Sequence, residues 1–131
     1  MAPVMILLGN FAKEFNLQNP ILRSSAPLYV IEITKPDMSI KLDFLYGPPE
    51  FHLEMILVYN PNKMNEARYG LAELFRNISI KKWVYDQKFE PMDNGKALFE
   101  QEAEWYCKML TETCKKAFEN PADFFKDLDI K

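Results

Sequence analysis

His52 is the single histidine of the chain, so a Ser–His or Cys–His mechanism near neutral pH would have to use it. It stands between Glu50 and Glu54, and residues two positions apart in a strand point to the same side. Two interpretations remain open: a base oriented by carboxylates or half of a metal site, and an ordinary histidine on a solvated sheet face. We favour the second, because HExxH, CxxC and the other known ligand spacings are absent. We predict no catalytic residue, no metal and no cofactor.

The two cysteines, Cys107 and Cys114, fall within residues 93–119, whose periodicity predicts one long helix. At a rise of about 1.5 Å per residue they would lie about 10 Å apart, whereas a disulfide needs Cα atoms within about 7 Å. In the middle of a helix, the dipole does little to lower the pKa of a thiol. We therefore expect two reduced, non-catalytic thiols, as in a cytosolic protein.

The composition argues against nucleotide and nucleic-acid binding. No two of the four glycines lie within three residues of each other, so the chain has neither a P-loop nor a dinucleotide fingerprint. The net charge is −3, and no basic stripe is present to neutralise a phosphate backbone. A protein partner, in particular a basic one, suits this charge better.

Apolar and polar residues alternate over residues 28–34, 38–46 and 50–59. This period predicts three strands, each with one buried and one wet face. Short turns at Lys35-Pro36-Asp37 and Gly47-Pro48-Pro49 connect them, so neighbouring strands are expected to be antiparallel.

The flanking segments complete the predicted fold. We expect a helix over 3–16, a loop over 18–27, a helix from Asn62 or Asn65 to Phe75, a fourth strand over 78–89, a long helix over 93–119, and a docked tail after Pro121. Residues 1–131 are thus predicted to form a single α+β domain. It has an N-terminal helix, an antiparallel meander of three to four strands, and a middle helix and a long C-terminal helix packed on one sheet face.

A partner-binding surface is predicted in the C-terminal half, where acidic residues gather near large aromatic residues. Acidic surfaces steer basic partners, and Trp and Tyr dominate interface hot spots. The alternative is a solvated helix face beside ordinary core aromatics. The predicted partner-binding residues are Trp83, Tyr85, Glu100, Glu104, Trp105 and Glu112.

The N-terminal apolar run is short and lacks a basic region before it, which is untypical of a signal peptide. No stretch approaches the roughly 20 apolar residues that span a bilayer. We expect a cytoplasmic protein that does not bind membranes.

The order of these elements resembles that of small bacterial immunity proteins, which neutralise polymorphic or contact-dependent toxins. The resemblance covers most of the chain and implies a cytosolic inhibitor that plugs a toxin, often through an acidic surface. It is carried by Phe11-Ala12-Lys13-Glu14-Phe15, the strands Tyr29 to Ile33, Ile40 to Phe44 and Leu53 to Leu57, the helix residues Ala103, Leu110 and Cys114, and Phe124-Phe125-Lys126-Asp127-Leu128.

The chain also looks like the single-effector chaperones of type III secretion, whose order is helix, three strands, helix, two strands, helix. Here Ile78 to Met92 leaves room for one strand instead of two, so this adaptor function is the second hypothesis. A small enzyme or ligand binder using His52 is the third. The sequence leaves the oligomeric state, monomer or dimer, open.

Overall fold

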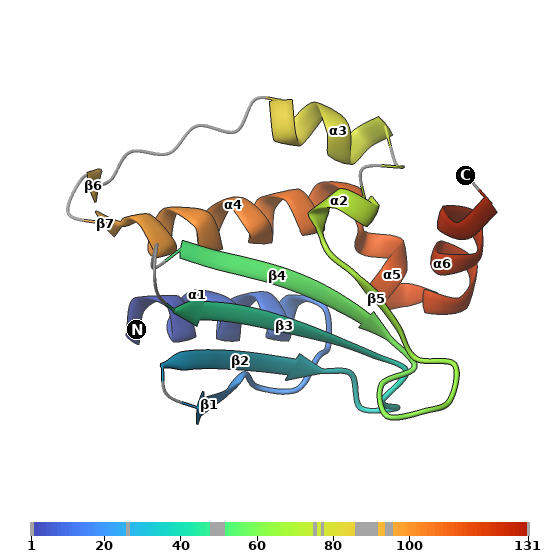
Figure 1. Cartoon of the computed structure of the whole chain (residues 1–131), viewed down its shortest axis with the longest axis horizontal. Helices are drawn as coiled ribbons and strands as arrows, with labels where there is room; N and C mark the ends of the chain where they lie inside the picture. Colours follow the sequence, from blue (N-terminus) through green and yellow to red (C-terminus); the bar gives the residue numbers. More distant parts are fainter. Residues whose placement is uncertain are drawn as a thin grey trace.

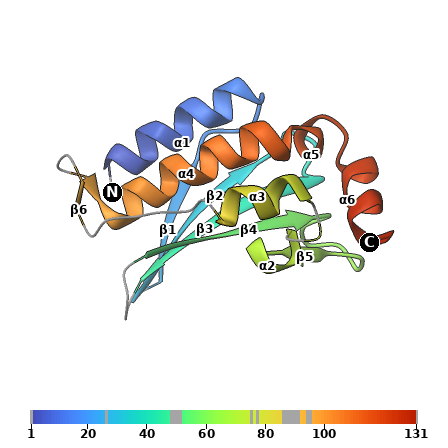
Figure 2. The ribbon, with the colours of Figure 1, turned by 90° about the horizontal axis from the view of Figure 1, so that it is seen from above.

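The computed structural model describes residues 2–25, 27–47, 52–74, 76, 78–85, 92–93 and 96–130. The strands β1 to β5 form an antiparallel five-stranded meander in chain order, and helices pack against one of its faces (Figures 1 and 2). The predicted α+β class is confirmed. The strands are β1 (Ile21–Ser25), β2 (Leu28–Thr34), β3 (Ile40–Gly47), β4 (His52–Tyr59) and β5 (Ala67–Tyr69).

The three central strands are those that alternation predicts, and their register explains the core. Ile33, Leu42 and Leu57 stand opposite one another across β2, β3 and β4, and all three are buried. The neighbouring row of Ile31, Phe44 and Met55 is also buried. Because side chains alternate along a strand, these rows form one apolar face. We call it the inner face.

Two helices cover the inner face. Helix α1 (Ala2–Glu14) and helix α4 (Leu98–Thr113) lie side by side above the sheet (Figure 2). Helix α4 packs against β4, and its Tyr106 ring meets Phe44 edge-on at 6.0 Å. Each helix turns one apolar stripe to the core, as the periodicity predicts. The buried residues of the two stripes are Val4, Leu8, Phe11, Ala12, Ala103, Tyr106, Cys107, Met109 and Leu110.

The predicted loop over 18–27 contains strand β1, which pairs with β2 from Ile21↔Glu32 to Ser25↔Leu28. Pro20 and Ser24-Ser25 are typical of loops, but β1 obtains its backbone hydrogen bonds from β2 and needs no strong propensity of its own. The prediction of a loop is wrong here.

The predicted helix from Asn62 or Asn65 to Phe75 is also wrong for the most part. Ala67–Tyr69 is strand β5, and only Leu71–Leu74 forms a helix, α2; Phe75 lies outside the described residues. Tyr69 pairs with Leu57 and is buried, so tertiary contacts override the helical spacing. The backbone N–H of Gly70 donates to Glu73 Oε2 at 2.8 Å, which caps the short helix.

Residues 78–85 form helix α3 (Ile78–Tyr85) instead of the predicted fourth strand, and residues 86–89 lie outside the described part. The β-branched and aromatic residues of this segment favour a strand, but packing decides its structure. Ile80 is fully buried and Trp83 half-buried three residues later, so one face of α3 packs toward α4.

The long helix predicted over 93–119 is divided. The short strands β6 (Met92–Asp93) and β7 (Lys96–Ala97) pair before α4 begins, and α4 ends at Thr113. Cys114, with φ −119 and ψ 16, separates it from α5 (Lys115–Glu119). The hydroxyls of Thr111 and Thr113 donate to carbonyls four residues earlier, a pattern that bends helices.

Within α4, Glu102 differs from the solvated acidic face that the sequence suggests. Its side chain is buried, with 6% of its surface exposed. The backbone N–H of Leu53 donates to Glu102 Oε1 at 3.3 Å. A carboxylate in the core therefore ties α4 to the beginning of β4.

The C-terminal helix α6 (Pro121–Ile130) docks at the end of the sheet where β4 ends and β5 lies (Figure 1). The Phe125 ring stacks on Tyr59 of β4 at 4.7 Å and on Tyr69 of β5 at 4.8 Å. The predicted docked tail is thus a full helix anchored by a buried aromatic ring.

We expect Phe125→Ala to lower the free energy of unfolding by about 3–5 kcal/mol, because it removes a fully buried ring and leaves a cavity. Urea denaturation measures the change. Met64→Ala is the control: Met64 is fully exposed in the β4–β5 loop, and its loss is expected to cost less than about 0.5 kcal/mol. Equal costs for the two variants would contradict the docking of α6.

Candidate functional site

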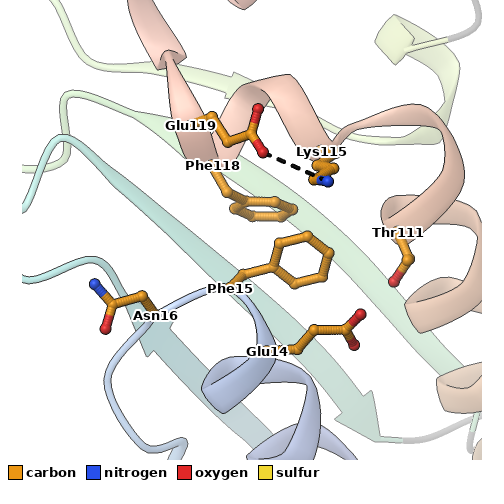
Figure 3. A pocket seen from close by; sticks show the side chains of 7 residues that line it. All are labelled: Glu14, Phe15, Asn16, Thr111, Lys115, Phe118 and Glu119. Carbon is orange, nitrogen blue, oxygen red and sulfur yellow. Dashed lines mark ion pairs between the residues drawn. The ribbon is translucent and has the colours of Figure 1, made fainter.

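A groove follows the line where α1 meets α4 and α5. It consists of two hollows of about 360 and 280 Å³, which share Glu14 and Thr111 as lining residues. We call it the α1–α4 groove, and Figure 3 shows its larger hollow. The residues lining one or both hollows are Leu7, Asn10, Phe11, Glu14, Phe15, Asn16, Cys107, Lys108, Thr111, Glu112, Lys115, Phe118 and Glu119.

Three phenylalanine rings line the α1–α4 groove. Phe11 lies on α1 and Phe15 in the turn that directly follows this helix, with their ring centroids 4.9 Å apart. Phe118 of α5 contacts both rings, at 5.7 Å from Phe11 and 5.1 Å from Phe15; Figure 3 shows the contact with Phe15. Phe15 remains half-buried, so the groove offers aromatic surface to a ligand.

Local backbone structure puts these rings together. Helix α1 ends in a Schellman-type turn, in which the N–H of Leu17 donates to the carbonyl of Ala12 at 2.8 Å and Asn16 takes a φ of 57°. The break at Cys114 begins α5 and places Phe118 beside the end of α1. Residues about 100 positions apart in sequence therefore share one surface.

Carboxylates border the groove. Glu14 lines both hollows and Glu112 the smaller one, and both are exposed. Glu119 forms an ion pair with Lys115 at 3.7 Å (Figure 3). Glu104 lies near enough to Cys107, another lining residue, to raise the pKa of its thiol. Carboxylates from α1 and α4 thus face the same depression.

Both cysteines are free, as predicted, and both are buried. Burial raises the pKa of Cys107 to about 12, with smaller contributions from Glu104 and then Glu14. Burial also raises the pKa of Cys114 to about 11. A thiol held protonated is a poor nucleophile, so the groove does not present a reactive cysteine at neutral pH.

The predicted partner-binding residues divide between the two sides of α4. Glu112 lines the α1–α4 groove, Glu104 lies near its lining residue Cys107, and Glu100 stands one turn before Glu104. Trp105 lies toward α3, where its ring meets Trp83 edge-on at 6.2 Å. Tyr85 ends α3, and its side chain lies outside the described residues. The structure therefore brings the two tryptophans together, whereas the three predicted glutamates follow one another along α4.

The two tryptophans are half-buried and already have partners in the chain. Trp83 and Trp105 pack against the core, and Trp105 also meets Tyr106 edge-on at 5.1 Å. These contacts hold α3 against α4. Their role as anchors for a partner stays a prediction.

The sequence did not indicate Glu14 or the three phenylalanines as site residues. Phe11 and Phe15 belong to the helical stripe, which marks them as core. The available signal was Glu14 directly beside Phe15, a charge at the border of an apolar stripe. Only the position of α5 shows that this border lies in a groove.

The second face of the sheet, which we call the outer face, carries no helix among the described residues (Figures 1 and 2). Asp43 lies in it with only 8% of its surface exposed, and its Oδ1 atom has no hydrogen-bond partner among these residues. Its Oδ2 lies 3.8 Å from Lys41 Nζ. Burial raises the pKa of Asp43, Lys41 opposes the rise, and Glu32 on the neighbouring strand adds to it.

His52, the candidate base, begins β4 opposite Gly47. Its side chain, like the whole of Glu50, lies outside the described residues, so its predicted solvated environment stays a prediction. Across the part of the chain that the structure describes, no three His, Cys, Asp or Glu side chains gather as a metal site. In that same part, no helix is long and apolar enough to cross a bilayer.

Comparison with known proteins gives no relative: no protein-family model, curated protein or solved structure significantly matches this chain.

We expect thiol reagents to modify the native protein far more slowly than the unfolded chain at pH 7. Against an ordinary pKa of 9.0, values of about 12 and 11 lower the thiolate fraction roughly a thousandfold for Cys107 and roughly a hundredfold for Cys114. Absorbance of released thionitrobenzoate, with and without urea, measures the two rates. Rapid modification of either thiol in the folded protein would contradict its burial.

We expect Asp43→Asn to be at least as stable as the wild type at pH 7. Burial raises the native pKa of Asp43 above 3.8, so the native state binds a proton more tightly than the unfolded state. The wild type therefore loses stability as the pH rises through the window from 3.8 to the raised pKa, and Asn does not titrate. We expect urea denaturation at several pH values to show that the free energy of unfolding of Asp43→Asn exceeds that of the wild type by more as the pH rises. A difference that shrinks with rising pH would contradict this expectation.

Proposed function

We propose that this chain is a non-catalytic protein-binding module, an immunity-type inhibitor that neutralises a toxin by binding it. The observation that carries the proposal is the α1–α4 groove, where Phe11, Phe15 and Phe118 lie beside carboxylates from two helices. An apolar centre with a charged border is the usual anatomy of a protein-binding surface.

The charges at the groove favour a basic partner. Glu14 and Glu112 border the groove, and Glu104 lies near enough to its lining residue Cys107 to raise the pKa of that thiol. The chain has a net charge of −3. Lys115 is already paired with Glu119, which leaves Lys108 as the other cation among the residues lining the two hollows. Such a field speeds encounter with a basic surface and makes the association rate sensitive to salt.

The shape of the groove suits an amphipathic segment of the partner. Its two hollows follow one another along the contact of α1 with α4 and α5. A helix or strand with apolar residues on one side and Lys or Arg at its borders would meet the rings and the carboxylates together.

A chaperone for a secreted effector is the second candidate, and one observation favours it. The sequence left room for a single strand between the middle and last helices, but the structure has the paired strands β6 and β7 there. The two strands before the long helix match the chaperone order in this part of the chain, whereas the first sheet has five strands instead of three. A cytoplasmic location belongs to both candidates.

Reversing the charge of the groove should weaken partner binding. We expect Glu14→Lys combined with Glu112→Lys to raise the Kd for the partner at least about tenfold, equivalent to about 1.4 kcal/mol, by replacing attraction with repulsion. The wild-type chain first captures the partner from the source cell, and calorimetry with the purified partner then measures each Kd. Glu54→Lys is the matched control, because Glu54 is exposed on the outer face of the sheet.

The captured partner decides between the candidates. Growth arrest by the partner alone, relieved when the wild-type chain is co-expressed but not when the double variant is, supports an inhibitor. A partner bound through an unfolded segment supports the chaperone. If the partner binds the double variant as tightly as the wild type, the α1–α4 groove is not the binding site in either proposed function.

A further inference from the structure

Strand β1 forms one edge of the five-stranded sheet, and no described residue pairs with the side of β1 that points away from β2. Its five residues follow β2 in unbroken register, from Ile21↔Glu32 to Ser25↔Leu28, so no bulge bends the edge away. An edge of this kind presents unpaired backbone N–H and C=O groups to another strand.

Exposed apolar side chains gather at this edge on both faces of the sheet. Ile21 and Leu28 belong to the outer face, with 51% and 37% of their surfaces exposed. Leu22 and Tyr29 belong to the inner face, with 41% and 38% exposed. A strand added beside β1 would cover apolar surface on both faces while satisfying its backbone groups.

We propose that the occupant is a second copy of this chain, whose β1 pairs antiparallel with β1 around a two-fold axis at Leu22. In this register the two Leu22 side chains meet on the inner face. On the outer face, Ile21 of each copy stands opposite Arg23 of the other. The two sheets become one continuous sheet.

Charge selects both the occupant and the register. A pairing centred on Arg23 would place two guanidinium groups opposite each other, which destabilises a strand pair. Centred on Leu22, Arg23 of one copy faces apolar Ile21 of the other, and the next residue in that row is Glu32, itself opposite Asp43. Glu32, the next side chain in that row beyond Ile21, thus complements an Arg23 side chain that is 63% exposed and already lies 3.5 Å from its own Glu32.

This pairing is independent of the proposed function. The α1–α4 groove is built from α1, α4 and α5, and β1 contributes no residue to its lining. A pair joined through β1 can therefore keep both grooves whether or not they bind a toxin.

The first test is the mass of the full chain in solution by sedimentation equilibrium at high micromolar concentration. We expect twice the 15.4 kDa of one chain. Leu22→Lys and Arg23→Glu should each shift the equilibrium to single chains, and circular dichroism shows that they remain folded. Met38→Lys, at an exposed apolar residue in the β2–β3 turn, is the matched control and should still form pairs. A wild-type chain that stays single overturns the proposal, and so does equal dissociation by Met38→Lys.

The second test fixes the register by cross-linking. Opposite residues of antiparallel strands have Cα atoms about 4.5–5.5 Å apart, within disulfide range, so Leu22→Cys should give a covalent pair under mild oxidation. Ser24→Cys is the control on the same strand, since its two copies would lie more than about 10 Å apart. The native thiols are buried and should not interfere. Equal cross-linking of the two variants overturns the register around Leu22.

Discussion

The structure depends on burying one face of the meander. The apolar rows that cross β2, β3 and β4 are buried beneath α1 and α4. If this inner face were exposed to water, the protein would lose the hydrophobic stabilisation that its burial provides. Covering one side fixes where the helices lie, and their contact creates the α1–α4 groove. The outer face of the sheet carries no helix among the described residues, and its charged side chains form ion pairs, between β1 and β2 for Arg23 and Glu32 and along β3 for Lys41 and Asp43.

The parts of the fold that sequence alone predicts are those in which burial repeats with a clear period. The alternation over β3 and β4 follows the register directly, and the stripe from Val4 to Phe11 follows α1. The failures lie where distant contacts decide. β1 and β5 are short strands that exist because a longer neighbour supplies their hydrogen bonds, and α3 is a helix of strand-forming residues that packs through Ile80 and Trp83.

The candidate site divides in the same way. Glu104 and Glu112 were predicted from a local excess of charge, which a sequence displays directly. The phenylalanine cluster and Glu14 were missed, because the break at Cys114 brings α5 back to the end of α1 and no local pattern encodes that return. Glu102 shows the opposite error: three glutamates at alternate positions look equivalent in sequence, yet one of them lies in the core and binds the backbone of β4.

The unequal lengths of the two sheet edges limit how far such molecules can assemble. β1 is five residues long, whereas β5 at the opposite edge has three and leads directly into α2, with Phe125 of α6 stacked on its Tyr69. In a pair that is symmetric about β1, both β1 edges are occupied. The two β5 edges that remain have too few backbone N–H and C=O groups to pair with a further molecule. The proposed pair would therefore close at two molecules instead of propagating into a fibre, the outcome that open, head-to-tail strand pairing would allow.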